Sequence, residues 1–351
     1  MSARLAAVPP RRDVKPRELV SMSVGDLTHA NATVDGRLAG TVSTSVVICA
    51  YTPSRWQAMC DAVDSVLTQR LPVDELLLVI DHDEDLFAAA LERYRGSVMP
   101  KVLRSTGPRG LSGARNTGLR AAGSDVVAFL DDDARAEPGW SEAMVAHYTA
   151  EDVEGVGGYA MPDWPDARPS WLPAEFDWVV GCSYVGQPTT VAPVRNFIGA
   201  NMSLRRDALV MVDGFDSSVG RIGSKPTGCE ETELCIRISQ RKPAARLLFD
   251  PDMRVWHTVS RDRTTFRYFV SRCYHEGRSK AMVSRLVGAS DGLSSERAYV
   301  SRVLPRAAAR GLASCTRAGL VRAAVVAVGV AVTSLGYLRG RVGSRSRGVV
   351  R

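Results

Sequence analysis

The chain has 351 residues, of which 45% are hydrophobic and 24% charged, and it is long enough for one large α/β domain or two small ones. Its net charge of +7 would suit a nucleic-acid binder only if the positive charge lay on the folded domain. Residues 297–351 contain 11 Arg and no Asp or Glu, so subtracting these charges from +7 leaves −4 for residues 1–296. We therefore expect no nucleic-acid partner.

The cysteines and the basic residues indicate where the protein works. The seven Cys form no CxxC pair and no zinc-ligand spacing, a pattern typical of reduced thiols in the cytoplasm. Residues 1–19 contain no apolar stretch long enough for a signal peptide. Only five of the 45 basic residues are Lys, and this Arg bias, with abundant Ala and Val, suggests a GC-rich bacterial genome.

The first third of the chain alternates between strand and helix patterns. After a loosely ordered leader over 1–40, the β-branched run 44–51 predicts a buried strand, and apolar residues at helical spacing predict a helix over 55–69 capped by Ser54. A second apolar run, 74–86, ends in an acidic loop. The same reasoning predicts a helix over 86–95, a strand over 99–106, a helix over 111–123 and a strand over 124–130. This order predicts a parallel sheet covered by helices on both faces.

The pattern changes beyond residue 140. Aromatic, Gly and Pro residues over 155–200 indicate short strands and long loops. A helix is predicted over 228–241, a strand, a turn and a second strand over 246–260, and further helices over 264–288.

Polar residues follow three of the predicted strands, at the sheet edge where ligands bind in such folds. These are Tyr51-Thr52, Asp81–Asp83 and Asp131–Asp133. Two Asp side chains at i and i+2 on a tight turn can approach one cation, and Mg²⁺ and Mn²⁺ prefer oxygen ligands and accept substrate phosphates beside them. The triple Asp therefore predicts a divalent metal site.

A second acidic cluster, Glu230, Glu231 and Glu233, begins the helix predicted over 228–241. The helix dipole alone accounts for Glu233, because acids in a first turn are stabilising. Three acids are more than a cap requires, so one of these carboxylates is a candidate to accept a proton from a nucleophilic hydroxyl.

Together these motifs resemble the family 2 glycosyltransferases, in a form typical of actinobacteria, and the resemblance covers about residues 44–290. It rests on the order of SVVICAY, LLLVIDHDEDL, GPRGLSGARNTGL, FLDDDA, GANMSLRRDALVMVDGFD and GCEETELCIRI. The resemblance implies an α/β GT-A fold with a mostly parallel central sheet, helices on both faces and additional C-terminal helices. It also implies an inverting transfer from a nucleotide sugar, such as a UDP- or GDP-sugar.

The resemblance assigns roles to particular residues. Mn²⁺ or Mg²⁺ would be held by Asp131, Asp133 and His257, with Asp133 foremost. Glu231 would be the catalytic base, but because the family usually has Asp there, Glu230 remains an alternative. The nucleotide would contact Ala50, Tyr51, Asp81, Asp83, Arg109, Arg115, Asn116, Asp131 and Asp132; whether Asp81 or Asp83 contacts the base is open, because the usual Asp pair is interrupted by His82.

The acceptor side is less specific. Trp164, Trp171, Trp178 and Tyr184 are of a type that stacks on sugar rings, although most large aromatic residues are simply core. Asn201 is compatible with a substrate contact or a structural turn. Two rival classes are a nucleotidyltransferase acting on sugar phosphates and a degenerate membrane-attached scaffold; SVVICAYTPSR lacks a Gly-rich phosphate loop, and a scaffold has no use for paired carboxylates.

The C-terminal segment predicts membrane attachment. Residues 323–338 are uncharged and lie between Arg-rich flanks, and a span requires roughly 20 residues, so the segment either spans the bilayer or lies in its interface. We expect the enzyme at the cytoplasmic face of the plasma membrane, acting on a glycan or lipid-linked acceptor. The predicted organisation is a leader (1–40), a nucleotide-sugar-binding half (41–135), an acceptor-binding and catalytic half (136–262), C-terminal helices (263–317), a membrane-associated helix (318–338) and a basic tail (339–351).

Overall fold

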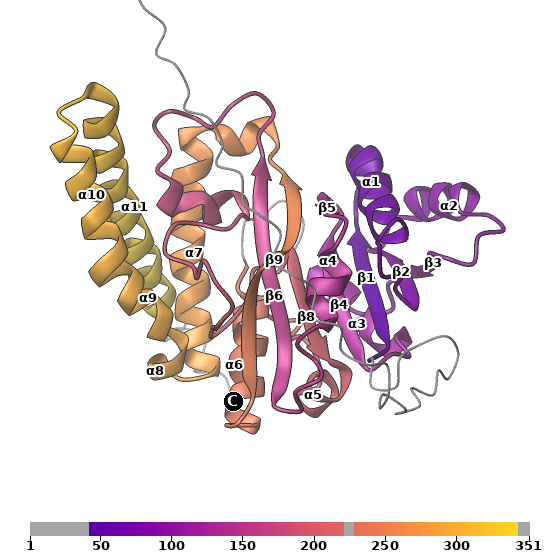
Figure 1. Cartoon of the computed structure of the whole chain (residues 1–351). Coiled ribbons are helices and arrows are strands. Elements are labelled where there is room, and N and C mark those ends of the chain that lie inside the picture. The colour runs from indigo at the N-terminus through magenta and orange to yellow at the C-terminus, as the bar shows by residue number, and fades with distance from the viewer. Residues whose placement is uncertain (1–41, 221–227, 343–351) are drawn as a thin grey trace, which may run out of the picture. The chain divides into compact units, whose positions relative to one another are not determined.

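The computed structural model describes residues 42–220 and 228–342, which belong to one compact unit. The predicted leader and residues 343–351 of the predicted basic tail lie outside the described residues. A nine-stranded sheet with the order β3-β2-β1-β4-β8-β6-β9-β5, in which β7 pairs with β9, runs through the unit (Figure 1).

The first four long strands lie side by side and parallel, as the sequence predicts. The elements are β1 (Thr44–Ala50), α1 (Trp56–Leu67), β2 (Glu75–Ile80), α2 (Glu84–Arg93), β3 (Lys101–Arg104), α3 (Leu111–Ala121) and β4 (Val126–Asp131). The prediction that Ser54 caps the first helix is wrong. Thr52 Oγ1 instead accepts from the Ser54 amide at 3.3 Å and caps a 3-10 turn, η1 (Pro53–Arg55), which precedes α1.

Beyond β4 the sheet becomes mixed. Its elements are β5 (Ala134–Ala136), α4 (Trp140–Val145), β6 (Val153–Asp163), η2 (Ala174–Val180), β7 (Ala192–Pro193), β8 (Asn201–Arg205), α5 (Arg206–Met211), α6 (Glu230–Arg241) and β9 (Arg246–Thr258). Strand β8 is antiparallel to β4 and β6, whereas β6 and β9 are parallel.

The predicted turn between two strands over 246–260 is wrong, because β9 is one strand. Its register against β6 shifts, so that Asp250 pairs with Gly158 and Val255 with Ala160. The intervening Pro251 and its neighbours are accommodated as an irregularity, since β6 continues to pair with β9 on both sides of it.

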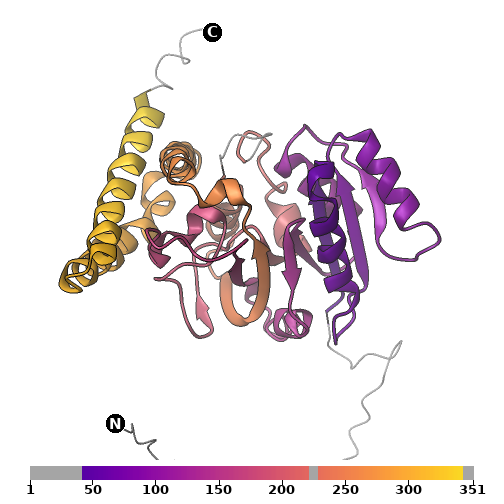
Figure 2. The same ribbon diagram turned by 90° about the horizontal axis from the view of Figure 1, so that it is seen from above.

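Both faces of the sheet are buried, which explains why the strands are almost uninterrupted apolar runs. Helices lie on both faces of the sheet (Figure 2). Val46 and Ile48 pack with residues of α1, α2 and α4, and Val47 and Cys49 pack with residues of α3 and α6. Helix α3 approaches β1 so closely that a Cβ at Gly118 would lie 2.3 Å from Val47 Cγ1. A residue larger than Gly there would displace the helix that carries the Gly-rich motif.

The C-terminal part is helical. It comprises η3 (Arg261–Thr264), α7 (Phe266–Leu286), α8 (Ala289–Gly292), α9 (Ser294–Ala298), the π-helical turn η4 (Tyr299–Val303), α10 (Leu304–Ala313) and α11 (Arg317–Val342). Figure 1 shows α10 and α11 beyond α7, on the side away from β1–β3. Helices α7 and α11 are in close contact, because a Cβ at Gly277 would lie 2.0 Å from the Thr333 carbonyl oxygen. Helix α11 is the one described helix long and apolar enough to cross a membrane, with a mean hydropathy of 1.9 over an 18-residue window.

Candidate active site

The triple Asp lies where β4 ends and the chain turns into β5. Strand β5 pairs with β9 in a register that sets Ala134 opposite His257, so the imidazole lies against the turn. The His257 Nε2 to Asp133 Oδ1 distance is 3.3 Å, and one ligand atom each from Asp131, Asp133 and His257 lies within 4.8 Å of the others. The structure thus brings together the three residues predicted to hold a metal.

Arginine 55 offsets the repulsion between the carboxylates. Its Nη1 lies 2.7 Å from Asp132 Oδ1 and 3.0 Å from Asp133 Oδ2. Burial, with the charge of Asp133, raises the pKa of Asp132 to about 7. Burial alone would also raise the pKa of Asp133, but His257 and Arg55 hold that pKa well below its usual range. Burial opposes protonation of His257, yet Asp133 outweighs it and raises the His257 pKa to about 10.

The donor atoms at this turn fit a divalent cation. Two carboxylates and an imidazole are ligands that divalent metals accept, and their ligand atoms are already clustered. In addition, the buried Asp132 Oδ2 has no hydrogen-bond partner within the described part of the chain. Buried polar atoms are normally satisfied, so an unpaired oxygen at this position is what a ligand-binding turn would show.

A single buried guanidinium connects this turn with the acidic helix. Arg115, 2% exposed, donates from Nη2 to Asp131 Oδ1 (3.0 Å) and to the Gly199 carbonyl (2.9 Å), and from Nη1 to Glu230 Oε1 (3.1 Å). Its burial and its three protein partners make Arg115 a positioning group that fixes Asp131 and Glu230 relative to each other.

The two acids at the start of α6 have different surroundings. Glu230 is buried and paired with Arg115. Glu231 is partly exposed and forms no ion pair with a described residue; the Thr232 hydroxyl donates to Glu231 Oε1 at 3.3 Å. Burial, followed by the charge of Glu230, raises the pKa of Glu231 to about 7. A carboxylate with that pKa can accept a proton near neutral pH.

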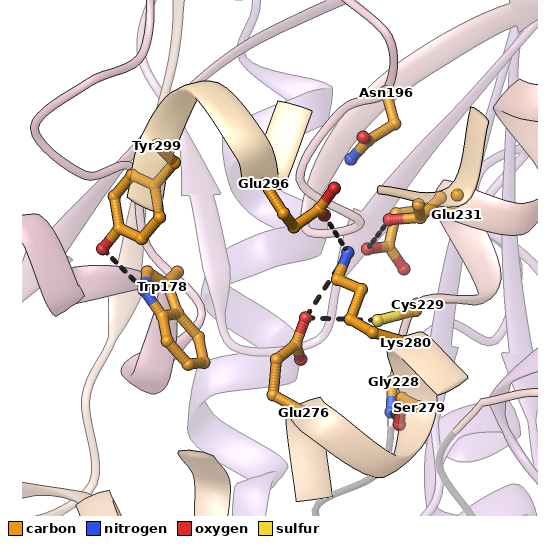
Figure 3. Close-up of polar contacts among 12 residues, drawn as sticks. Trp178, Asn196, Gly228, Cys229, Glu231, Glu276, Ser279, Lys280, Glu296 and Tyr299 are labelled. Atoms are coloured by element: carbon orange, nitrogen blue, oxygen red, sulfur yellow. Dashed lines mark hydrogen bonds and ion pairs between the residues drawn. The ribbon is translucent and has the colours of Figure 1, made fainter. Parts of the chain in front are cut away.

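Beside Glu231 lies an ionic cluster that the sequence did not predict (Figure 3). Lys280 Nζ on α7 lies 2.8 Å from Glu296 Oε1 on α9 and 3.5 Å from Glu276 Oε1. Arg195 also pairs with Glu296, at 2.6 Å. Spacing alone could not reveal this cluster, because its members come from a loop and two helices up to 101 residues apart.

The predicted nucleotide contacts lie at the same edge of the sheet. Asp81 follows β2, accepting from the Gly110 amide at 2.9 Å and lying 2.8 Å from His82 Nδ1. Asp83 instead caps α2 by accepting from the Leu86 amide at 2.8 Å. Arg109 is exposed and donates to the His82 carbonyl at 2.7 Å.

The other predicted contacts have mixed surroundings. Ala50 is buried at the end of β1, and Tyr51 is 39% exposed with the Arg55 guanidinium 5.5 Å from its ring centre. Asn116 makes two hydrogen bonds to the backbone of Phe215. Asn201 is fully buried between the Trp140 indole and two backbone carbonyls, which makes it structural.

One pocket of about 960 Å³ unites the metal-type cluster with the acids. Its lining includes Asp131, Asp133, His257, Glu230 and Glu231. Of the predicted aromatic residues, Trp178 and Tyr184 line it. Trp171 packs instead against Phe266 and Phe269, and Trp164 against Arg168.

The mixed sheet with its parallel half, the Asp turn that follows β4 and the acidic helix that lines the same pocket define a GT-A-type transferase. Comparisons with known proteins identify it further. The profile described as "Glycosyl transferase family 2" matches residues 45–210. A glucosyl-dolichyl phosphate glucuronosyltransferase of Haloferax volcanii is 36% identical over 244 residues, which cover 69% of this chain and 77% of that protein. The chain belongs to glycosyltransferase family 2.

More distant similarities agree with this assignment. The pre-mycofactocin glycosyltransferase of Mycobacterium tuberculosis is 30% identical over 185 residues, 52% of this chain and 36% of that protein. Among solved structures, the mannosyltransferase PcManGT from Pyrobaculum calidifontis, in complex with GDP-Man and Mn²⁺, superposes with a TM-score of 0.56 at 16% identity, covering 86% of this chain and 88% of that one. GalNAc-T7 with UDP, GalNAc and Mn²⁺ gives a TM-score of 0.50 at 17% identity, covering 76% and 57%.

Family membership decides between the classes that the sequence left open. The protein is a glycosyltransferase that uses a nucleotide-sugar donor, with a DXD-type cluster at Asp131–Asp133, and not a nucleotidyltransferase. The predicted GT-A fold is confirmed, and the predicted actinobacterial type stays a prediction.

Proposed function

We propose that the protein is an inverting, metal-dependent glycosyltransferase that transfers a sugar from a UDP- or GDP-sugar to a hydroxyl of a lipid-linked glycan in cell-envelope synthesis. The observation that supports this most directly is the pocket itself. It is lined both by the Asp131, Asp133 and His257 cluster and by Glu231, whose pKa of about 7 suits a general base.

The transfer is a single displacement. The Glu231 carboxylate takes the proton of the acceptor hydroxyl, whose oxygen forms a bond to the anomeric carbon. The bond from that carbon to the diphosphate oxygen breaks, and the nucleoside diphosphate leaves with the electron pair. Attack from the face opposite the leaving group inverts the configuration. Glu230 is the weaker candidate for the base because Arg115 already pairs with it at 3.1 Å.

Asp131, Asp133 and His257 are the residues that would hold the divalent ion. When bound, such an ion supplies positive charge that stabilises a leaving diphosphate. The imidazole in the ligand set favours Mn²⁺ over Mg²⁺, because Mg²⁺ is bound almost entirely by oxygen. For the nucleotide, Asp81 is the better candidate for the base contact, since Asp83 is engaged as the cap of α2.

The lipid-linked acceptor is supported by the Haloferax relative, whose name includes a dolichyl phosphate substrate, and by α11. The outward face of α11 exposes Leu320, Leu335, Leu338 and Val342 between Arg side chains. Its other face packs on α7, which carries seven charged or basic residues of types disfavoured in a bilayer core, from Arg267 to Arg285. We therefore place α11 in the membrane interface and not across it, on the cytoplasmic face.

The test uses the full chain with vesicles or detergent. It is incubated with a panel of UDP- and GDP-sugars, with Mn²⁺, Mg²⁺ or EDTA, and with polyprenyl-phosphate-linked glucose as acceptor. We expect metal-dependent incorporation of labelled sugar into the lipid fraction, with the inverted anomeric configuration by NMR. Transfer that persists in EDTA would refute metal dependence, and retention of configuration would refute the single displacement. Absence of transfer with every donor would refute the acceptor class.

A further inference from the structure

The pocket that contains Glu231 continues into an apolar arm formed by the C-terminal helices. The arm lies between η2, η4, α10 and α11, and residues from all four line the same 960 Å³ pocket as the catalytic acids. Trp178 Nε1 donates to Tyr299 Oη at 3.2 Å, so these two aromatic residues expose ring surface without an unpaired polar atom between them (Figure 3). We define the apolar arm by Phe176, Trp178, Tyr299, Val303, Val330 and Tyr337.

The ionic cluster of Lys280, Glu276 and Glu296 lies between Glu231 and this arm. Lys280 faces both carboxylates, Arg195 also pairs with Glu296 and Arg272 with Glu276, so the carboxylates are balanced and the cluster offers little net charge to a ligand. Along the rest of the pocket the same holds: every described lining cation has a carboxylate within 4.0 Å, with two exceptions. The exceptions are Arg302 and Arg306.

These two arginines mark the place where the pocket reaches the surface. Arg302 and Arg306 are exposed and one helical turn apart. The neighbouring lining residues Val300 and Leu338 are also open to solvent, at 47% and 61% exposure. The opening is therefore apolar with two uncompensated positive charges, and Leu338 also belongs to the exposed apolar face of α11.

We propose that the outer part of the pocket binds an isoprenyl-phosphate-linked acceptor, with Arg302 and Arg306 receiving its phosphate. The sugar points from the phosphate through the apolar arm towards Glu231, and the hydrocarbon chain leaves the opening over Leu338 and along α11, where the bilayer interface lies. This deepens the proposed function and rests on it. An isoprenoid chain matches the exposed apolar face of α11 because it has no polar groups to desolvate, and the aromatic rings of the arm suit the apolar faces of a sugar. A phosphate matches the arginines because charge-assisted bonds to guanidinium are strong.

Binding can be tested without transfer. The full chain is titrated with farnesyl phosphate, farnesol and inorganic phosphate, and dissociation constants are measured by calorimetry. We expect farnesyl phosphate to bind more tightly than farnesol, and inorganic phosphate to bind weakly. The double variant Arg302→Glu/Arg306→Glu should weaken farnesyl phosphate at least about tenfold, since two charge-assisted bonds become repulsive, and leave farnesol within about twofold.

Arg297→Glu is the matched control. It makes the same kind of charge change at an exposed residue of α9 that does not line the pocket, and should leave every constant within about twofold. Equal weakening by Arg297→Glu would reduce the effect to general electrostatics and overturn the proposal. Equally tight binding of inorganic phosphate would identify a simple anion site and would overturn it too.

A second pair of variants tests the path of the hydrocarbon chain by steric block. Ser334 is exposed and lines the pocket, whereas Ala331 is exposed on the same helix and does not. Ser334→Trp should weaken both farnesyl phosphate and farnesol, and Ala331→Trp should weaken neither. If lipid-linked acceptors are used and neither pair alters their KM, this inference fails while the proposed function stands. If no lipid-linked acceptor is glycosylated but farnesyl phosphate binds as described, the lipid phosphate site stands while the proposed function fails.

Discussion

Replacing Glu231 with Gln removes a carboxylate that cannot ionise easily in the folded protein. Burial and the neighbouring Glu230 raise the Glu231 pKa from an ordinary 4.5 to about 7. At about 1.4 kcal/mol for each pH unit, this corresponds to about 3 kcal/mol, and less to the extent that water in the pocket screens the charge. The isosteric amide keeps the size and most of the polarity of the side chain but has no charge.

The sign of the effect follows from proton binding. Below pH 4.5 the folded and unfolded chains both carry the proton, so Glu231→Gln should change stability little. Between pH 4.5 and 7 the unfolded chain loses the proton first, and the wild-type protein is destabilised progressively relative to the variant. Above pH 7 the variant should be the more stable protein by up to about 3 kcal/mol.

The transfer activity of Glu231→Gln should fall, whereas its stability at neutral pH should rise. A base with a pKa of about 7 is mostly protonated at pH 5–6, so wild-type kcat/KM should fall about tenfold per pH unit below 7. Glu231→Gln should lower kcat about 10²–10⁴-fold at pH 8 and should lose the wild-type fall in activity below pH 7, while nucleotide binding is retained.

The measurements are denaturant unfolding at pH 4.5, 6 and 8 and initial rates over the same range. Glu230→Gln is the control: it also removes one carboxylate, but takes from the buried Arg115 one of its two carboxylate partners, and should therefore destabilise the protein. A variant Glu231→Gln with full turnover, or one less stable than wild type at pH 8, would refute the assignment of the base and direct attention to Glu230.

Three further changes probe other parts of the site. Asp133→Ala should abolish Mn²⁺-dependent binding of UDP or GDP in calorimetry; undiminished metal-dependent binding would contradict its role as a ligand. Arg115→Met should cost about 3–5 kcal/mol in denaturant unfolding, because it leaves two carboxylates unpaired in a buried site, and a loss below about 1 kcal/mol would show that the guanidinium is dispensable. Leu335→Asp/Leu338→Asp should lower sedimentation with anionic vesicles, whereas Leu91→Asp on exposed α2 should not; equal loss from both would argue against α11 as the membrane-binding face.

The parallel half of the sheet could be predicted because each strand is a short apolar run followed by a helix pattern. That local signal fixes which end of each strand lies at the binding edge of the sheet, and so it also predicted that Asp81 and Asp131 lie on the same edge. The continuous β9 could not be predicted from Asp250-Pro251-Asp252, because a local turn signal was overridden by pairing with β6 on both sides.

The positioning role of Arg115 was beyond the reach of the sequence. An arginine on a helix is usually solvated, and its partners Asp131, Gly199 and Glu230 lie 16, 84 and 115 residues away. The apolar arm is equally non-local, since its walls run from Phe176 to Tyr337. Aromatic residues such as Trp178 indicated an apolar surface, but only the packing of the C-terminal helices decides whether that surface is core or pocket.

Two arginines compensate the negative charge of the three consecutive aspartates. Arg55 approaches Asp132 and Asp133 from η1, at the end of β1, and Arg115 approaches Asp131 from α3. Arg115 is buried and also bound to Glu230, so it stays in place whatever the pocket contains. Arg55 is less buried, with 22% of its side chain exposed, and is the group that a cation bound to the same carboxylates would compete with. The repulsion that makes the run costly for a strand end is therefore what a divalent cation at the proposed site would relieve.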